Sequence, residues 1–238
     1  MYRLITTIAF LMCSALSALA QSQTLSFTMD HSDIYPGTTR TIKVYVPSAY
    51  DGKTPACLAV RMDDIMYGLT SALDTLYAEG KMPLTIAVGV TPGRINDEEG
   101  GVIRYNRSNE FDRIDGKFAS FLEKEVLPMV EKQVTSDGRE IRISPSADDR
   151  MILGASSGAI AAFAAAYNRP DLFSRVYSIV GTYVPMRGGD MLPGLVRKTE
   201  PKRIRVFLQD NDEDSWNLLF GSWYEYNLLM NSALEWAG

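Results

Sequence analysis

The chain lacks the charge pattern of proteins that bind nucleic acid or anionic membranes. It has 24 lysine and arginine residues against 29 aspartate and glutamate residues, and its formal net charge is −5. The basic residues form no cluster along the sequence. A mildly acidic chain of this kind is a poor ligand for nucleic acid and for anionic membrane surfaces. We therefore expect neither as a partner.

An apolar run long enough to span a membrane is also missing. The most apolar stretch, Leu4 to Leu16, follows Arg3 and precedes the small residues of Ala18-Leu19-Ala20. A spanning helix needs roughly 20 apolar residues, whereas a positive start, a shorter apolar stretch and small residues are typical of a secretory signal peptide. We predict that residues 1–20 are such a peptide. The mature protein is then secreted or periplasmic, without membrane attachment.

Cysteine is scarce, and its placement excludes an internal disulfide. Cys13 would leave with the signal peptide, so Cys57 remains alone inside an apolar run. Despite the oxidising destination, we expect Cys57 to be a small buried hydrophobic residue. The sequence has no internal repeat and no low-complexity linker. Residues 21–238 are therefore expected to form one domain.

Apolar periodicity indicates strands that alternate with helices. Residues 25–29 and 42–46 alternate apolar with polar side chains, which predicts an antiparallel pair. Later apolar runs predict strands covered on both faces, with helices between them. This order implies an α/β fold with a mainly parallel, doubly wound sheet. The later segments are a strand 56–60, a helix 69–77, a strand 84–90, a polar loop 91–112, a helix 118–126 that Pro128 kinks or ends, a strand 151–153, a helix 157–167, strands 176–180 and 204–209, and a helix 216–236 in which Leu218, Leu219, Tyr226, Leu229, Met230 and Leu234 pack.

The most informative stretch is Met151 to Ala161, in which a short apolar run enters Gly154-Ala155-Ser156-Ser157-Gly158 and an alanine-rich run leaves it. Gly-x-Ser-x-Gly between a strand and a helix is the pattern of a nucleophile elbow, a sharp turn that raises the central hydroxyl above the sheet. Ser156 is then the candidate nucleophile for an ester carbonyl, and the backbone N–H of Ser157 is a candidate oxyanion donor. The alternative is that both glycines only allow close helix–strand packing.

An acidic segment directly follows the last expected strand. A position beyond the carboxyl end of a late strand, after the serine in the chain, suits the acid of a catalytic triad. Asp210, Asp212 and Asp214 are all candidates. Their alternation also suggests calcium, but an EF-hand loop needs Gly and Glu where this chain has Ser215 and Gly221. We expect no metal and no cofactor; a weak surface cation site or a solvated loop are the alternatives.

The base that such a serine needs is missing from the expected site. The only histidine, His31, lies far upstream in a polar turn between the first two strands, where we expect it at the surface. The sequence ends at Gly238, at the close of the last expected helix. A doubly wound sheet would continue there with another strand and then the loop that presents histidine.

The residues resemble the putative esterase family of α/β-hydrolases, which holds feruloyl-esterase-like and enterochelin-esterase-like proteins. The elbow together with Arg169-Pro170-Asp171 is the most specific part of the resemblance. It implies the α/β-hydrolase fold and an exported serine carboxylic-ester hydrolase that forms an acyl-enzyme with a small-molecule or carbohydrate ester. The other similar segments are Ile34–Thr38, Val44–Pro47, Ala78–Pro83, Asn106–Asp112, Phe121–Val130, Arg187–Gly189 and Val206–Asp210.

The resemblance also implies roles for single positions. Ser156 is the nucleophile, Asp214 is the acid with Asp212 as the fallback, and the N–H of Asp63 is the second oxyanion donor beside Ser157. The family tends to have Asp-Gly where this chain has Asp63-Asp64. The histidine of the family follows one more strand. The chain is therefore expected to be a C-terminally truncated, nearly inactive esterase that lacks a strand and a helix; a degenerate member is the alternative.

A secreted, non-catalytic module that binds carbohydrate on a hydrolase scaffold is the alternative function. Aromatic side chains in or near loops could offer stacking faces, although buried aromatic residues are commoner. Whichever function applies, polar residues could line the rim of the substrate pocket, although surface salt bridges are equally compatible with their positions. The aromatic candidates are Tyr67, Tyr105, Tyr183 and Trp216, and the polar ones are Arg107, Glu110 and Arg187.

Overall fold

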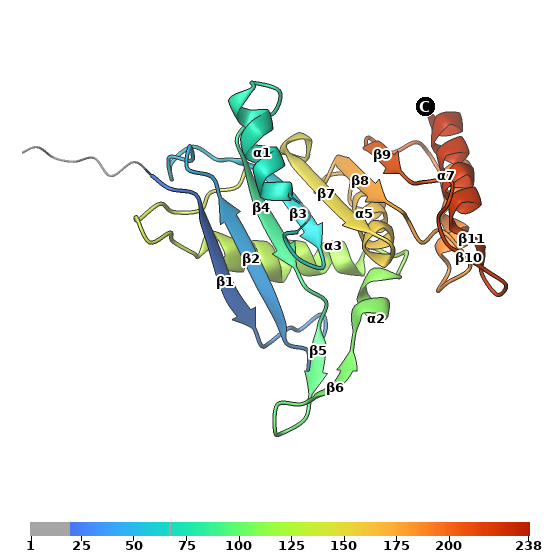
Figure 1. The fold of residues 1–238 in the computed structure, drawn as a ribbon, viewed down its shortest axis with the longest axis horizontal. Coiled ribbons are helices and arrows are strands. Elements are labelled where there is room, and N and C mark those ends of the chain that lie inside the picture. Colours follow the sequence, from blue (N-terminus) through green and yellow to red (C-terminus); the bar gives the residue numbers. More distant parts are fainter. Residues whose placement is uncertain (1–19, 67) are drawn as a thin grey trace, which may run out of the picture.

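A seven-stranded mixed sheet runs through the middle of the protein (Figure 1). Its strands are β1 (Gln23–Met29), β2 (Arg40–Val46), β3 (Cys57–Met62), β4 (Thr85–Val90), β7 (Arg150–Ala155), β8 (Arg175–Ile179) and β9 (Arg205–Gln209). Their order in the sheet is β1-β2-β4-β3-β7-β8-β9. The pairs β1–β2 and β2–β4 are antiparallel, and all pairs from β4 to β9 are parallel. The predicted α/β class and the N-terminal antiparallel pair are confirmed.

The computed structural model describes residues 20–66 and 68–238, so the predicted signal peptide, except for Ala20, and Tyr67 lie outside it. Within these ranges no helix is long and apolar enough to cross a bilayer.

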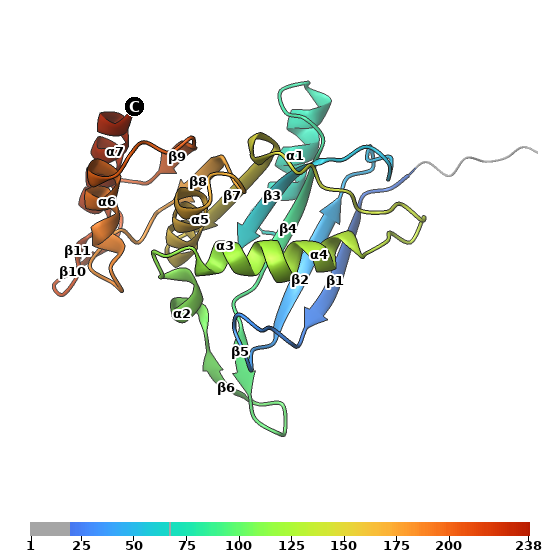
Figure 2. The same ribbon diagram turned by 180° about the vertical axis from the view of Figure 1, so that it is seen from behind.

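Helices cover the two faces of the sheet unequally (Figures 1 and 2). One face carries α1 (Leu69–Ala78), which packs on β4. The opposite face carries α5 (Ser157–Asn168), which contacts β3, β7 and β8, and beside it lie α3 (Lys117–Phe121), the π-helical turn η1 (Leu122–Val126) and α4 (Leu127–Glu131). Beyond β9, α6 (Leu192–Lys198) packs against α7 (Trp223–Ala237). The remaining short helices are α2 (Arg107–Phe111), η2 (Ala147–Asp149) and η3 (Gly189–Met191).

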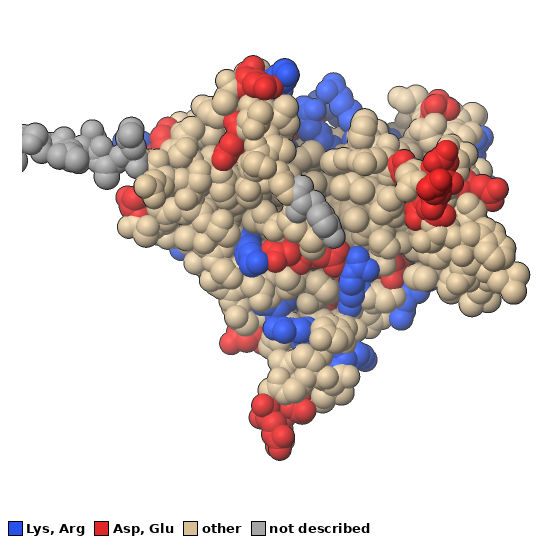
Figure 3. Space-filling model, viewed as in Figure 1, with Lys and Arg blue, Asp and Glu red and all other residues tan. Residues whose placement is uncertain are grey.

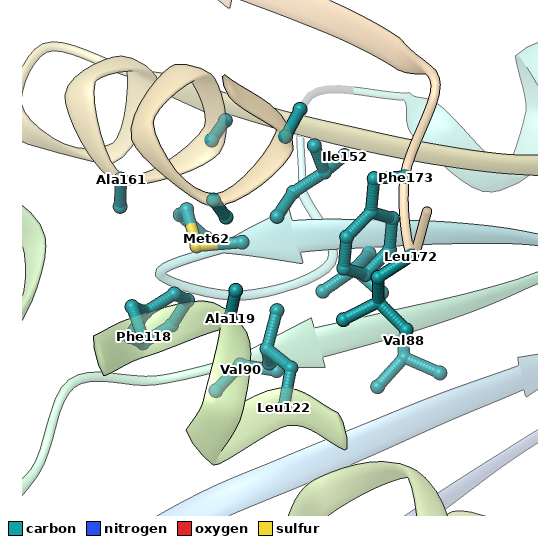
Figure 4. Packing of buried hydrophobic residues seen from close by; sticks show 14 of the residues in the cluster. Met62, Val88, Val90, Phe118, Ala119, Leu122, Ile152, Ala161, Leu172 and Phe173 are labelled. Carbon is teal, nitrogen blue, oxygen red and sulfur yellow. The ribbon is translucent and has the colours of Figure 1, made fainter. Parts of the chain in front are cut away.

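The main core lies between the sheet and α5. Figure 4 shows strand side chains such as Met62, Val88 and Ile152 gathered against Phe118 and Ala161 from the helices. All six residues of β4 are buried, as expected for a central strand covered on both faces. Residues 157–167 of α5 are also buried, and their many alanines let this helix lie close to the strands.

The prediction of an irregular polar loop over residues 91–112 is wrong. It contains a hairpin of β5 (Arg94–Asn96) and β6 (Val102–Tyr105), followed by α2. These elements are short, and the hairpin is largely exposed, so apolar periodicity does not mark them.

The predicted helix 216–236 starts seven residues late, at Trp223. The Ser222 hydroxyl caps it by accepting a hydrogen bond from the Glu225 N–H at 3.2 Å. The preceding residues form a second small hairpin of β10 (Trp216–Asn217) and β11 (Gly221–Ser222). Three predicted packing residues are exposed instead, namely Leu218 (89%), Leu219 (77%) and Leu229 (47%).

Pro128 interrupts the regular helix but does not end it. The α-helix that starts at Lys117 gives way to a π-helical turn at Leu122, and α geometry resumes at Leu127 and continues to Glu131. Proline has no N–H to donate, and its ring collides with the carbonyl four residues earlier. A wider turn directly before Pro128 accommodates both effects.

A buried ion pair ties α2 to the sheet. Arg40 of β2 donates to both oxygens of Glu110, at 2.6 and 3.0 Å, and both side chains are 0% exposed. Glu110 also accepts from the Gly93 N–H at 3.2 Å and from the Asn106 side chain at 2.8 Å. The guanidinium of Arg40 lies over the Phe121 ring, 4.4 Å from its centroid. Glu110 is therefore an anchor and not a residue of a pocket rim.

Removing the charge of Glu110 should strongly destabilise the protein. Glu110→Gln leaves the Arg40 guanidinium buried without a counter-charge, and breaking such a pair costs about 3–5 kcal/mol of unfolding free energy. Urea denaturation measures this loss. Glu98→Gln, on the exposed β5–β6 connection, is the control and should change stability by no more than about 0.5 kcal/mol. An unchanged midpoint for Glu110→Gln would contradict the anchoring role.

Candidate active site

Three neighbouring strands are each followed by a residue with a strained backbone. Asp63 after β3 has φ 75°, Ser156 after β7 has φ 56°, and Val180 after β8 has φ 43°. These strands are adjacent and parallel, so the three residues lie at one edge of the sheet. A positive φ is unfavourable for residues other than glycine, and such strain concentrates at functional sites. The candidate active site is therefore at this edge.

Ser156 occupies a sharp turn between β7 and α5, with φ 56° and ψ −123°. Both flanking glycines are required by close approach. A Cβ on Gly154 would lie 2.3 Å from the Gly158 carbonyl oxygen, and a Cβ on Gly158 would lie 2.9 Å from Met62 Cβ. The glycines thus serve close helix–strand packing, and this same packing holds the serine in the geometry of an elbow.

The Ser156 hydroxyl contacts a second hydroxyl from the loop after β8. Its Oγ lies 2.9 Å from Thr182 Oγ1, and the Thr182 oxygen also accepts a hydrogen bond from Trp223 Nε1 at 3.3 Å. Thr182 is buried. Sequence reasoning missed Thr182 and Trp223, because nothing in the sequence indicates that the start of α7 lies beside the elbow.

Asp63 reaches the site through its carboxylate. Its N–H donates to the Val90 carbonyl oxygen at 3.0 Å and is thus engaged in the sheet, which argues against the predicted oxyanion role. Arg107 of α2 donates to both carboxylate oxygens of Asp63, at 2.7 and 2.9 Å, and to the Ala155 carbonyl oxygen at 3.4 Å. The hydrogen bonds that Arg107 donates to the Asp63 carboxylate raise the pKa of Arg107. The N–H of Ser157 starts α5 and stays the predicted oxyanion donor.

The acidic loop brings two of its three candidate acids together. Asp210 and Asp214 interact, whereas Asp212 is exposed. Burial, and then hydrogen bonding to and repulsion by Asp214, raise the pKa of Asp210 from 3.8 to about 6. In the described part of the chain, Oδ2 of each carboxyl group is buried and accepts no hydrogen bond from an N–H or hydroxyl group. The role of Asp214 as triad acid stays a prediction, with Asp210 as its structural neighbour.

Acidic side chains also gather in Figure 3 over the region of β9 and α7. Even so, residues 20–66 and 68–238 hold no group of three or more His, Cys, Asp or Glu that could bind a metal ion. The polar side-chain groups at the candidate site are hydroxyl, carboxyl and guanidinium groups.

His31 is exposed, as predicted, and is hydrogen-bonded to Asp33 at 3.0 Å. It lies between β1 and β2, at the opposite side of the sheet from β8 and β9. His31 therefore does not lie beside Ser156. Cys57, predicted to be buried, is an unpaired and only partly buried thiol.

The three aromatic candidates that the structure describes, Tyr105, Tyr183 and Trp216, form no shared stacking surface. Tyr183 is fully buried, packs edge-on against Phe163 and bonds the Ser178 hydroxyl at 2.9 Å, so its predicted role as a stacking face is wrong. Tyr105 and Trp216 are exposed but belong to two separate hairpins. Among the polar candidates, Arg107 is at the site, and the exposed Arg187 reaches Asn109 at 3.3 Å.

Comparison with known proteins identifies the family. A family model described as putative esterase matches residues 34–222. No curated protein is similar enough in sequence to match the chain. Several solved structures are similar. The enterobactin esterase from Shigella flexneri has a TM-score of 0.65 at 18% identity, over 90% of this chain and 51% of that chain. A ferulic acid esterase has a TM-score of 0.66 at 16% identity, over 92% and 87%.

An IroE-like serine hydrolase from Shewanella oneidensis has a TM-score of 0.61 at 19% identity, over 90% of this chain and 70% of that chain. At such identities the likeness shows a shared fold. This chain spans about half the length of the enterobactin esterase.

Adding a methyl group at the elbow should be far more costly than adding one elsewhere. Gly154→Ala places Cβ against the Gly158 backbone, so we expect a loss of about 1–3 kcal/mol from overpacking. Gly194→Ala is the matched control, because its Cβ would meet nothing within 4 Å and it lies inside α6, where alanine is favoured by about 0.5–1 kcal/mol. Thermal unfolding of both variants measures the difference, and similar shifts would contradict the close approach.

The Asp210–Asp214 pair should make stability depend on pH. Because the pKa of Asp210 is raised to about 6, the folded state binds this proton more tightly than the unfolded chain. The stabilisation is full below the ordinary pKa and is lost as pH rises through about 6. Asp210→Asn should therefore raise Tm at pH 8 and have little effect at pH 4. Asp212→Asn, at the exposed position, should do neither. A Tm difference independent of pH would refute the coupling.

Proposed function

The chain belongs to the putative esterase family, and we propose that it is an exported carboxylic ester hydrolase with Ser156 as its nucleophile. The observation that carries this proposal is the strained turn that holds Ser156 at the carboxyl edge of the sheet, at the first residue after β7. The strain at Asp63 and Val180 on the neighbouring strands supports the same location.

The proposed reaction passes through an acyl-enzyme. Ser156 Oγ bonds to the ester carbonyl carbon while its proton moves to an imidazole base, and the carbonyl oxygen takes the negative charge. The Ser157 N–H stabilises this oxyanion. The ester C–O bond then breaks, and the alcohol leaves with the proton. Water releases the acid by the same steps, and Asp214 orients the base, with Asp212 as the fallback.

We place the base on a segment outside residues 1–238. Two features support this. The edge strand β9 exposes Phe207 (64%), and beside it a cavity of about 400 Å³ lies over Met151, Tyr177 and Val206. Among the described residues, no N–H or hydroxyl group donates to the buried Oδ2 atoms of Asp210 and Asp214. A further strand on β9, a loop with histidine and a helix over this face would satisfy both. Residues 21–238 are then most of an esterase domain.

Two similar structures indicate the class of substrate that we propose. One similar structure is named a ferulic acid esterase and another an enterobactin esterase. On this likeness we propose a small-molecule or carbohydrate ester for this chain. Export follows from the signal-peptide pattern of residues 1–20.

Imidazole in solution should partly restore the missing base. We expect residues 21–238 to hydrolyse p-nitrophenyl acetate slowly, and imidazole to raise the Ser156-dependent rate by about tenfold, less than the factor of about 10²–10⁴ of a positioned base. Ser156→Ala measures the reaction of imidazole with the ester itself and is subtracted. Equal rates for both proteins at every imidazole concentration would refute the nucleophile.

Extending the chain through its natural reading frame tests the place of the base. The extended protein should hydrolyse the ester without imidazole, and faster than residues 21–238. Equal rates for the two proteins would show that the base does not lie on a following segment, whatever the result for Ser156→Ala.

A further inference from the structure

We propose that Thr182 is a catalytic residue that donates a hydrogen bond to Ser156 Oγ and stabilises the negative charge that develops there. This inference rests on the proposed function of Ser156. The two hydroxyl oxygens are 2.9 Å apart, and Thr182 Oγ1 has one other partner, Trp223 Nε1 at 3.3 Å.

The direction of the hydrogen bond follows from the donors. An indole N–H can only donate, so Thr182 Oγ1 must accept from Trp223. The Thr182 proton is then left with one oxygen in reach among the described residues, Ser156 Oγ. A buried hydroxyl that pointed its proton elsewhere would leave a donor unsatisfied. Thr182 therefore donates to Ser156, and the proton of Ser156 stays free for a base.

The fold holds Thr182 in this place before any substrate binds. Val180 turns the chain after β8 with its φ of 43°, and the Thr182 N–H donates to the Ser156 carbonyl oxygen at 3.4 Å. Asn227 of α7 donates to the Gly181 carbonyl oxygen at 2.8 Å. Thr182 is 2% exposed. Since the hydroxyl is fixed by these contacts, no reorganisation is needed when charge forms on Ser156 Oγ.

A donor at this position assists both halves of the reaction. When Ser156 Oγ bonds to the carbonyl carbon, its proton passes to the base, and the Thr182 hydrogen bond offsets the charge on the attacking oxygen. When water later breaks the Oγ–C bond of the acyl-enzyme, the electron pair returns to Oγ, and the same hydrogen bond stabilises it until the base returns the proton. Trp223 acts through Thr182 and is a positioning residue.

Four variants test this inference in the imidazole-assisted hydrolysis of p-nitrophenyl acetate by residues 21–238. Thr182→Val keeps the shape but removes the donor, and the Ser156-dependent rate should fall about tenfold or more, as for a hydrogen bond to a charged group. Thr182→Ser keeps the hydroxyl and should retain most of the rate. Trp223→Phe should lower the rate less, and should have no further effect when combined with Thr182→Val.

Thr85→Val is the matched control. Thr85 is also buried, and its hydroxyl donates to the Pro83 carbonyl oxygen at 2.9 Å, at the amino end of β4. This variant loses a buried hydroxyl far from Ser156 and should lose stability without losing rate. Urea midpoints of all variants separate loss of folded protein from loss of rate.

The outcomes separate the two proposals. If wild type is faster than Ser156→Ala but Thr182→Val equals wild type, the role of Thr182 is refuted and that of Ser156 stands. If Thr182→Val is faster than wild type, Thr182 accepts the serine proton and competes with the base, which reverses the proposed direction. If wild type never exceeds Ser156→Ala, both proposals fail together.

Discussion

The close approach of α5 to β7 is the constraint on which the site depends. Gly154 and Gly158 leave no room for a Cβ between strand and helix. Because the helix starts this close to the strand, the chain has one residue, Ser156, in which to reverse direction, and it does so with a positive φ. The buried, alanine-rich helix α5 follows the turn and contacts three strands, and these contacts hold the turn in place. Strain in one residue is thus held by packing along a whole helix.

A second series of contacts, made by α2, holds the residues around Ser156 in place. The buried Arg40–Glu110 pair fixes α2 on the sheet, and Arg107 in the same short helix holds the Asp63 carboxylate and reaches the carbonyl oxygen of Ala155, one residue before the serine. A helix of five residues cannot order itself by its own hydrogen bonds. The buried ion pair therefore orders the residue that lines the site, and its cost in desolvation is offset by the hydrogen bonds around Glu110.

The central strands and α5 could be predicted from the sequence, because burial on both faces produces continuous apolar runs and the elbow has a local pattern. The β5–β6 hairpin, the late start of α7 and the burial of Tyr183 could not. Strand Arg94–Asn96 is too short and polar for a periodicity, and the Ser222 cap resembles any other serine in the sequence. Thr182 and Trp223 are 41 residues apart and meet only through the tertiary fold. The sequence pattern identifies Ser156, but it does not identify the hydroxyl of Thr182 that contacts it or the indole of Trp223 behind that hydroxyl.

The two carboxyl groups after β9 connect this geometry to the proposed chemistry. Burial, and then the neighbouring Asp214 carboxyl group, disfavour the charged form of Asp210, which is why its pKa is raised to about 6. A triad acid has the opposite requirement, because it must stay ionised beside an imidazolium. An imidazole N–H placed against Asp214 would supply a hydrogen-bond donor, and its positive charge in the reaction would favour the ionised form of Asp210. The proposed base would therefore act against the burial that raises the pKa of Asp210.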